Sequence, residues 1–234
     1  MKKFYYSLSI VLSLFLSSPA LAKTEGFYLG LDVIHSRSKV KTQTVSIATI
    51  SSYYAKMGIT PDFYKIDQSF NNSKMGMGFN AKYAINFNNF YLAPGFSLDY
   101  LNLNPKKYSH DMGFDINLKM SSRMAYYADF GYDINDTFSI FVPLGTNRII
   151  YELNTIDLWN DASLKAYTKD SDSSLFYGLG VNAKVNEKFA LKFEYNKTSL
   201  NLDSKTKTVQ LYTDTKIRNK VNLDIFKIGA VYKF

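Results

Sequence analysis

The chain has 234 residues, of which 46% are hydrophobic and 16% aromatic, with a formal net charge of +8 and no cysteine. Its mean hydropathy of -0.18 excludes a protein built from several membrane-spanning helices, because each such helix needs about 20 consecutive apolar residues. The same value does not exclude a membrane β-barrel, whose strands alternate apolar lipid-facing residues with polar interior ones.

Residues 1–22 have the pattern of a secretory signal peptide. Lys2 and Lys3 supply the positive start, Leu8–Leu16 the apolar stretch, and Ala20-Leu21-Ala22 a small-x-small cleavage site. The apolar stretch is too short for a comfortable transmembrane helix, although an uncleaved anchor helix is the alternative. We therefore predict a signal peptide over 1–22 and a mature domain over 23–234, and the absence of cysteine suits export.

Beyond residue 23, apolar residues recur at every second position in eight segments, which is the pattern of β-strands with one apolar face. The segments cover 27–33, 75–83, 90–100, 123–132, 138–144, 175–185, 189–195 and 226–234. Their other faces hold glycine, small residues and charges of both signs. Such faces suit the narrow lumen of an eight-stranded barrel, where opposite charges pair.

The connections between these segments alternate between short and long. The short ones contain Asn86, Asn135 and Asn186, and asparagine tolerates the left-handed conformation that tight hairpins require. The long ones cover about 36–73, 102–113, 146–174 and 197–220. Short turns on one rim and long extracellular loops on the other are typical of an outer-membrane barrel. We predict an all-β, eight-stranded antiparallel transmembrane β-barrel, with ten strands as the alternative if part of 45–70 forms another hairpin.

The last residues of the chain form an alternating strand that ends in an aromatic residue. Phe226, Ile228, Tyr232 and Phe234 share one face of this segment. The pattern resembles the terminal strand that the outer-membrane assembly machinery recognises, so these four residues are the predicted assembly signal. Phenylalanine and tyrosine also stand at the ends of other segments, where aromatic girdles meet lipid headgroups.

Three segments carry a family resemblance: 26–30 (GFYLG), 177–181 (YGLGV) leading into 186–189 (NEKF), and the terminal Phe234. With them the chain resembles the small outer-membrane barrel family that includes the opacity proteins, the Ail/OmpX group and the OmpA transmembrane domain, and its layout is similar to rickettsial surface adhesins. The resemblance covers the strands but not the loops. It implies exposure on the cell surface, adhesion to host cells and capture of serum proteins.

Basic residues dominate two of the four long connections. The residues predicted to contact a partner are Lys39 and Lys41 in the first and Lys205, Lys207, Lys216 and Arg218 in the fourth. Such a rim would attract acidic partners, for example heparan-type glycans or acidic stretches of host proteins. The alternative is that these charges solvate the loops or pair with lipopolysaccharide phosphates. Nucleic acid is not expected, because no sheet face offers a stacking platform.

The first and third connections also hold apolar residues, among them Tyr53, Tyr54 and Trp159. One interpretation is an anchor patch for a protein partner, with these three aromatic residues at its centre. The other is that the strands continue above the membrane and pack on each other. The sequence leaves both open.

Catalysis finds little support in the sequence. His35 and His110 fall near the long-loop rim beside ordinary loop residues, and a catalytic histidine needs a nucleophile and an orienting carboxylate within reach. We predict no enzyme activity and no catalytic, cofactor or metal site. The predicted function is adhesion to host cells or capture of host proteins, with a structural or weak pore-forming role as the alternative. The predicted partners are outer-membrane lipid and lipopolysaccharide, the assembly machinery, and host surface or serum proteins.

Overall fold

The structure is a computed structural model that describes residues 24–48, 65–109, 114–157, 164–208 and 213–234. These residues form nine antiparallel strands: β1 (Gly26–Ala48), β2 (Lys65–Phe87), β3 (Phe90–Leu103), β4 (Lys106–Ser109), β5 (Phe114–Asp133), β6 (Phe138–Asp157), β7 (Leu164–Lys184), β8 (Phe189–Thr208) and β9 (Thr213–Lys233). Within those ranges no helix is long and apolar enough to cross a membrane.

Eight of the strands close into a ring. β1 pairs with both β2 and β9, and β3 pairs with both β2 and β5. β4 follows β3 after a short break and pairs only with β5, so it adds no strand to the ring. The predicted eight-stranded barrel is confirmed. β1 and β2 pair without interruption from Gly26↔Ala84 to Val45↔Lys65, which leaves no room in the ring for the additional hairpin of the ten-stranded alternative.

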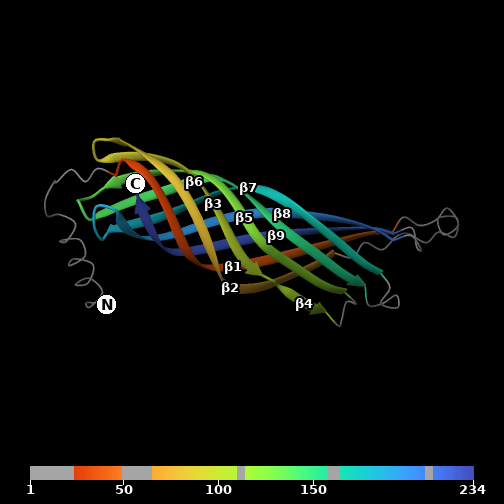
Figure 1. Cartoon of the computed structure of the whole chain (residues 1–234). Coiled ribbons are helices and arrows are strands. Elements are labelled where there is room, and N and C mark those ends of the chain that lie inside the picture. The colour runs from red at the N-terminus through yellow and green to blue at the C-terminus, as the bar shows by residue number, and fades with distance from the viewer. Residues whose placement is uncertain (1–23, 49–64, 110–113, 158–163, 209–212) are drawn as a thin grey trace, which may run out of the picture.

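The three short turns lie at one end of the barrel together with the C-terminus (Figure 1). Asparagine shapes each of them, but the left-handed conformation expected of Asn86, Asn135 and Asn186 occurs in none of these three and is found at Asn88, which has a φ of 60°. In the other two turns the side-chain Oδ1 of Asn135 and of Asn186 accepts two backbone N–H groups of the residues that follow. Asparagine therefore works mainly as a side-chain cap of the turn.

The barrel wall next to these turns presents an apolar band to the outside. Leu31, Met77, Leu179 and Ile228 are 58–70% exposed on four different strands, although each is a large apolar residue. Aromatic rings border the band at the short-turn end, where Phe189 packs on Tyr232 with ring centroids 5.0 Å apart. An outward apolar band with an aromatic border is the lipid-facing surface of a membrane barrel.

The segments predicted as long loops are strands over most of their length, because each strand continues beyond the apolar band. At the upper edge of the band, which is the edge farther from the short turns, the apolar residues move from the outer side of the barrel wall to the inner side. Pairs of adjacent apolar residues mark this change. One member of each pair points outward and the other inward: Val33 and Ile34, Tyr100 and Leu101, Ile150 and Ile149, Leu175 and Phe176, Phe226 and Ile225. The interior is thus polar inside the band and apolar above it.

Above the band the ring divides into two sheets. Pairing between β2 and β3 stops at Met77↔Tyr100, and pairing between β7 and β8 stops at Phe176↔Thr198. The continuing parts of β8, β9, β1 and β2 stay paired as a first sheet, and those of β4, β5, β6 and β7 as a second sheet. Figure 1 shows β1, β8 and β9 ending together, apart from the ends of β6 and β7. We call these two sheets together the extension.

Apolar side chains fill the space between the two sheets. From the first sheet come Val40, Leu200, Leu202, Val221 and Leu223, and from the second sheet and the end of β3 come Leu103, Leu118, Met120 and Leu153; all are at most 2% exposed. The extension is therefore a small β-sandwich with a water-excluding core, built on top of a membrane barrel.

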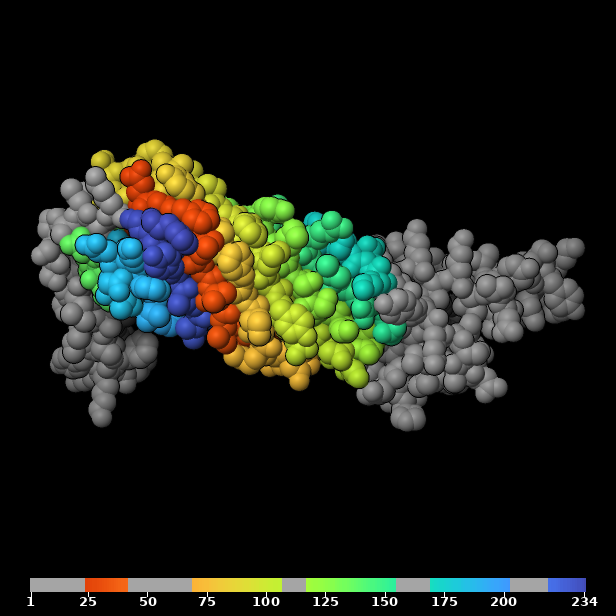
Figure 2. Space-filling model, viewed as in Figure 1, coloured from red at the N-terminus to blue at the C-terminus, as the bar shows by residue number. Residues whose placement is uncertain are grey.

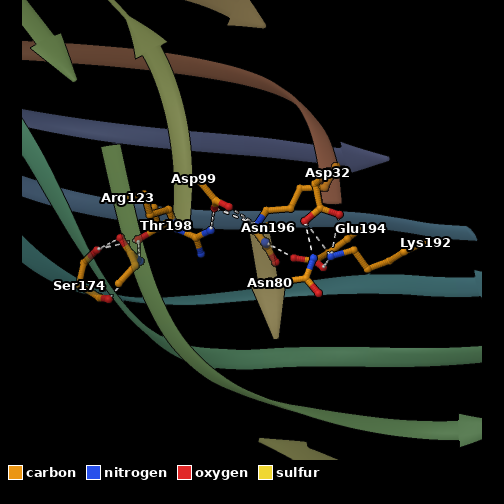
Figure 3. Close-up of polar contacts among 11 residues, drawn as sticks. Asp32, Asn80, Asp99, Arg123, Ser174, Lys192, Glu194, Asn196 and Thr198 are labelled. Carbon is orange, nitrogen blue, oxygen red and sulfur yellow. Dashed lines mark hydrogen bonds and ion pairs between the residues drawn. The ribbon is translucent and has the colours of Figure 1, made fainter. Parts of the chain in front are cut away.

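A hydroxyl group bridges the wall at each place where the sheets part. On one side, Ser36 Oγ donates to the carbonyl oxygens of Lys74 in β2 and Leu101 in β3, both at 3.3 Å. On the other side, Thr198 Oγ1 donates to the carbonyl of Leu175 at 2.7 Å and lies 2.8 Å from Ser174 Oγ (Figure 3). These bonds satisfy backbone groups that lose their strand partner at the forks.

Ion pairs fill the lumen inside the apolar band. Four basic and four acidic side chains form them: Lys82–Asp129 at 2.7 Å, Arg123–Asp99 at 2.6 Å, Lys227–Asp99 at 2.8 Å, Lys192–Asp32 at 3.0 Å and Lys192–Glu194 at 3.1 Å. Figure 3 shows the Lys192 and Arg123 groups as two neighbouring clusters. The lumen charges predicted from the sequence therefore form ion pairs with each other. Together with the core of the extension above them, these side chains obstruct the lumen of the barrel.

Candidate functional site

The outer face of the first sheet carries a group of exposed basic side chains. Arg37, Lys39 and Lys41 alternate along β1, while Lys197 projects from β8 and Lys220 from β9. Every second residue of a strand points to the same face, so the β1 residues form a row. Figure 2 shows β1 in red between β9 in blue and β2 in orange on the molecular surface. We call the face defined by these five side chains the basic face.

Strand register brings the members of this face together. Lys41 stands directly opposite Lys220 of β9, and Arg37 and Lys197 both stand opposite Asp224. Like charges directly opposite each other destabilise a sheet, so the Lys41–Lys220 pair costs stability. Asp224 is half-buried and accepts a hydrogen bond from Tyr195 Oη at 2.7 Å. Its single charge offsets only part of the positive charge around it.

The basic side chains of this face are available to bind an anionic partner. In the described parts of the chain, none of the five forms an ion pair with a carboxylate. The remaining outward residues beside them on β2 are Ser69, Asn71 and Ser73, which are exposed and uncharged. The face is therefore positive and polar, and able to attract anionic groups from solution.

The outer face of the second sheet differs, because its charges compensate each other. Glu152 pairs with Lys119 at 3.4 Å and with Lys169 at 3.6 Å. Arg148 Nε donates to Ser171 Oγ at 2.8 Å. Among the described side chains, the first sheet thus presents a basic surface without ion pairs, and the second sheet presents a mixed surface with ion pairs.

The structure brings together most of the partner residues predicted from the sequence. Lys39 and Lys41 lie on the basic face. Lys205 and Lys207 in β8 and Lys216 and Arg218 in β9 continue the same sheet, with Lys205 opposite Lys216 and Lys207 opposite Asp214. The described parts of the first and fourth connections therefore belong to one sheet. Tyr53, Tyr54 and Trp159 lie outside the described residues, so the anchor patch remains a prediction.

Arg37, Lys197 and Lys220 were not among the residues predicted to contact a partner, although they belong to the same first and fourth connections. The signal was available, since the first and last strands of a closed barrel must pair and so join the first and fourth connections. Of the two histidines considered for catalysis, His35 is exposed on β1 beside the Phe226 ring, with centroids 6.4 Å apart, and His110 lies outside the described residues. Among the described residues no three metal-binding side chains cluster.

Residues 8–234 match the model of a protein family described as the outer membrane protein beta-barrel domain. The chain belongs to this family. Membership agrees with the closed barrel, its apolar band and its aromatic border, and it places the protein in the bacterial outer membrane. In this family geometry the short turns face the periplasm and the opposite end faces the cell surface, so the extension is extracellular. No curated protein sequence matches the chain.

Solved structures with a similar fold include three outer-membrane barrels. The chain superposes on OprG of Pseudomonas aeruginosa with a TM-score of 0.55 and 15% identity, over 92% of this chain and 99% of that chain. For Neisserial surface protein A the TM-score is 0.45 at 15% identity, over 89% and 97%. For Ail, the attachment invasion locus protein of Yersinia pestis, solved with the heparin analogue sucrose octasulfate, it is 0.40 at 16%, over 88% and 99%. At these identities the likeness to OprG bears on the fold alone.

Proposed function

We propose that this outer-membrane barrel acts by binding, through its extracellular extension, to host-cell surfaces or to host proteins that it captures. The basic face carries the proposal, because none of its five side chains forms an ion pair within the described residues. Five exposed cations lie on one side of the extension, and Lys41 stands directly opposite Lys220 across β1 and β9, where the like charges repel each other. Such a surface suits partners with acidic stretches or sulfated and phosphorylated groups, and it would speed their association at low salt.

The interior favours binding over transport. A solute would have to displace the ion pairs of Lys82, Arg123, Lys192 and Lys227 and then cross the apolar core of the extension. Each broken pair would leave a charge unpaired in a buried site, which is costly. A structural or weak pore-forming role is the second candidate, and it rests on the barrel alone.

We also propose that the protein is not an enzyme. His35 is exposed on the wall and lies beside the Phe226 ring, and among the described residues neither a nucleophile nor a carboxylate is bonded to it. A catalytic histidine needs both.

Capture of host proteins by the refolded barrel tests this proposal. Protein in neutral detergent would be incubated with serum and with host-cell surface extract at several salt concentrations. We expect specific host proteins to be retained, and retention to fall as salt rises and when Lys39 and Lys41 are changed to Gln. The matched control changes Lys119 and Lys169 on the second sheet. Absence of any capture at every salt concentration would contradict the proposal and favour the structural role.

A further inference from the structure

A groove of about 790 Å³ lies in the wall where the barrel meets the extension. Along most of its length it is lined by apolar residues of neighbouring strands, among them Leu31 of β1, Met77 of β2, Leu98 of β3 and Met124 of β5. These four side chains are 41–70% exposed, so they belong to the outer, lipid-facing surface. The basic face takes no part in this groove.

The groove ends at two basic residues on the second sheet, Arg148 of β6 and Lys169 of β7. Arg148 is exposed, and its Nε donates to Ser171 Oγ at 2.8 Å, which orients the guanidinium group. The Lys169 side chain is 60% exposed, and its Nζ lies 3.6 Å from Glu152, a long contact for an ion pair. Asp170 also lines this end, and its Oδ1 accepts the backbone N–H of Ser171.

Arg148 lies at the edge of the apolar band, and Lys169 lies beyond it, opposite Glu152. Arg148 precedes Ile149 and Ile150, the adjacent pair at which the inward and outward apolar faces of β6 exchange. Arg148 stands opposite Met124 of the band on one side and Ser173 on the other. The groove therefore runs from the hydrocarbon region to the level of the lipid headgroups, on the extracellular side.

An occupant must match both halves of this groove. The apolar half fits an acyl chain, because a chain that lies in the groove fills a depression in the apolar wall. The basic half fits a phosphate, because a guanidinium fork binds two phosphate oxygens at once and an ammonium adds a second charge. A zwitterionic headgroup would bring its own cation beside the two basic side chains, and an uncharged headgroup would bring no phosphate.

From this geometry we propose that the groove binds one phosphorylated glycolipid of the outer leaflet. An acyl chain lies over Leu98 and Met124, and a phosphate lies between Arg148 and Lys169. The site is independent of the proposed capture of host molecules, since none of its residues belongs to the basic face.

Native mass spectrometry of the refolded full chain in neutral detergent tests this site. The probes are diphosphorylated lipid A, dephosphorylated lipid A and phosphatidylethanolamine. We expect one diphosphorylated lipid A to remain bound to the wild type, and at least tenfold weaker retention of the other two. R148Q/K169Q should lose at least tenfold of the lipid A retention, while K39Q/K41Q should keep it. R148K should fall between wild type and R148Q/K169Q, because it keeps the charge without the fork.

Folding of each variant would be checked by its heat-dependent gel mobility, and R148Q alone would replace the double variant if that failed to fold. Equal retention of all three lipids would overturn the site, as would equal loss in R148Q/K169Q and K39Q/K41Q. No retention of any lipid would overturn it as well. None of these outcomes bears on capture of host proteins, which K39Q/K41Q reports separately.

Discussion

Tyr91 of β3 lies directly opposite Gly131 of β5, and its ring occupies the space that a side chain on Gly131 would need. A Cβ at position 131 would overlap the ring atoms of Tyr91. Phe141 of β6 covers Gly180 of β7 in the same way. A large aromatic residue set over a glycine on the neighbouring strand fills the lumen next to the short turns and fixes the register of the pair.

Replacement of Gly131 by alanine should therefore destabilise the barrel. We expect a loss of about 1–3 kcal/mol in the free energy of unfolding, because the added methyl group forces the Tyr91 ring out of place. The measurement is urea unfolding of the refolded protein in lipid vesicles. In the Tyr91→Ala background the same substitution should cost much less. Equal costs in the two backgrounds would contradict the proposed contact, because a double-mutant cycle then shows no coupling.

The ion pairs in the lumen should be important for stability. Lys192 Nζ lies 3.0 Å from Asp32 and 3.1 Å from Glu194, and its side chain is 2% exposed. Lys192→Met leaves two carboxylates buried near each other without their cation, so we expect a loss of about 3–5 kcal/mol in the free energy of unfolding. Urea titration in vesicles measures it.

Lys169→Met is the matched control for that experiment. Lys169 pairs with Glu152 at 3.6 Å, and its side chain is 60% exposed. An exposed pair of this kind contributes about 0–1 kcal/mol, so the control variant should unfold close to the wild-type midpoint. A loss for Lys192→Met as small as that for Lys169→Met would show that the lumen pairs do not support the barrel.

The sequence predicts the barrel well because its strands obey a simple physical rule. Inside the bilayer, side chains on one side of the wall meet lipid and those on the other side meet the lumen, which produces the alternation over 27–33 or 226–234. The lumen charges follow from the same rule. Their partners do not, because the contact of Lys192 with Asp32 depends on the closure of β8, β9 and β1 side by side.

The extension was harder to predict, because the alternation changes phase at the membrane surface. In β1 the outward residues turn from Leu31 and Val33 to Arg37 and Lys39, while the inward ones turn from Asp32 to Ile34. A search for one continuous apolar face ends at this point and assigns the remainder to a loop. The signal is the pair of adjacent apolar residues at the change, Val33-Ile34 in this strand. The first still faces lipid on the outer side of the wall, and the second already faces the apolar core on the inner side.

A mutation in the core of the extension should destabilise the extension without unfolding the membrane-embedded barrel. Leu118 is fully buried between the two sheets, so Leu118→Ala should destabilise the sandwich by about 2–5 kcal/mol. We expect faster proteolysis of the extension in intact vesicles, with cleavage in β5 or in neighbouring strands. The membrane-embedded fragment should keep its heat-dependent gel mobility. Leu31→Ala, at a position 70% exposed to lipid, is the control and should leave the proteolysis rate unchanged. Identical cleavage rates in the two variants would argue against a packed core above the membrane.

The blocked lumen predicts a closed barrel in electrical recordings. Ion pairs occupy the lumen within the band, and the apolar core lies above them in the described residues, so both obstruct the passage of ions. In planar bilayers the purified wild type should show no conductance above the baseline of the lipid. Stable, reproducible channel steps would contradict this prediction and favour the pore-forming role.

Adhesion of a non-adherent bacterium that displays the protein tests the binding function most directly. Cells carrying the wild type, a basic-face variant with Arg37, Lys39, Lys41, Lys197 and Lys220 changed to Gln, or a control with Lys119 and Lys169 changed to Gln would be counted on cultured host cells at equal surface amounts. We predict adhesion by the wild type and the control, and a loss of at least tenfold for the basic-face variant. Equal adhesion by all three strains, or none above the empty strain, would contradict binding through this face.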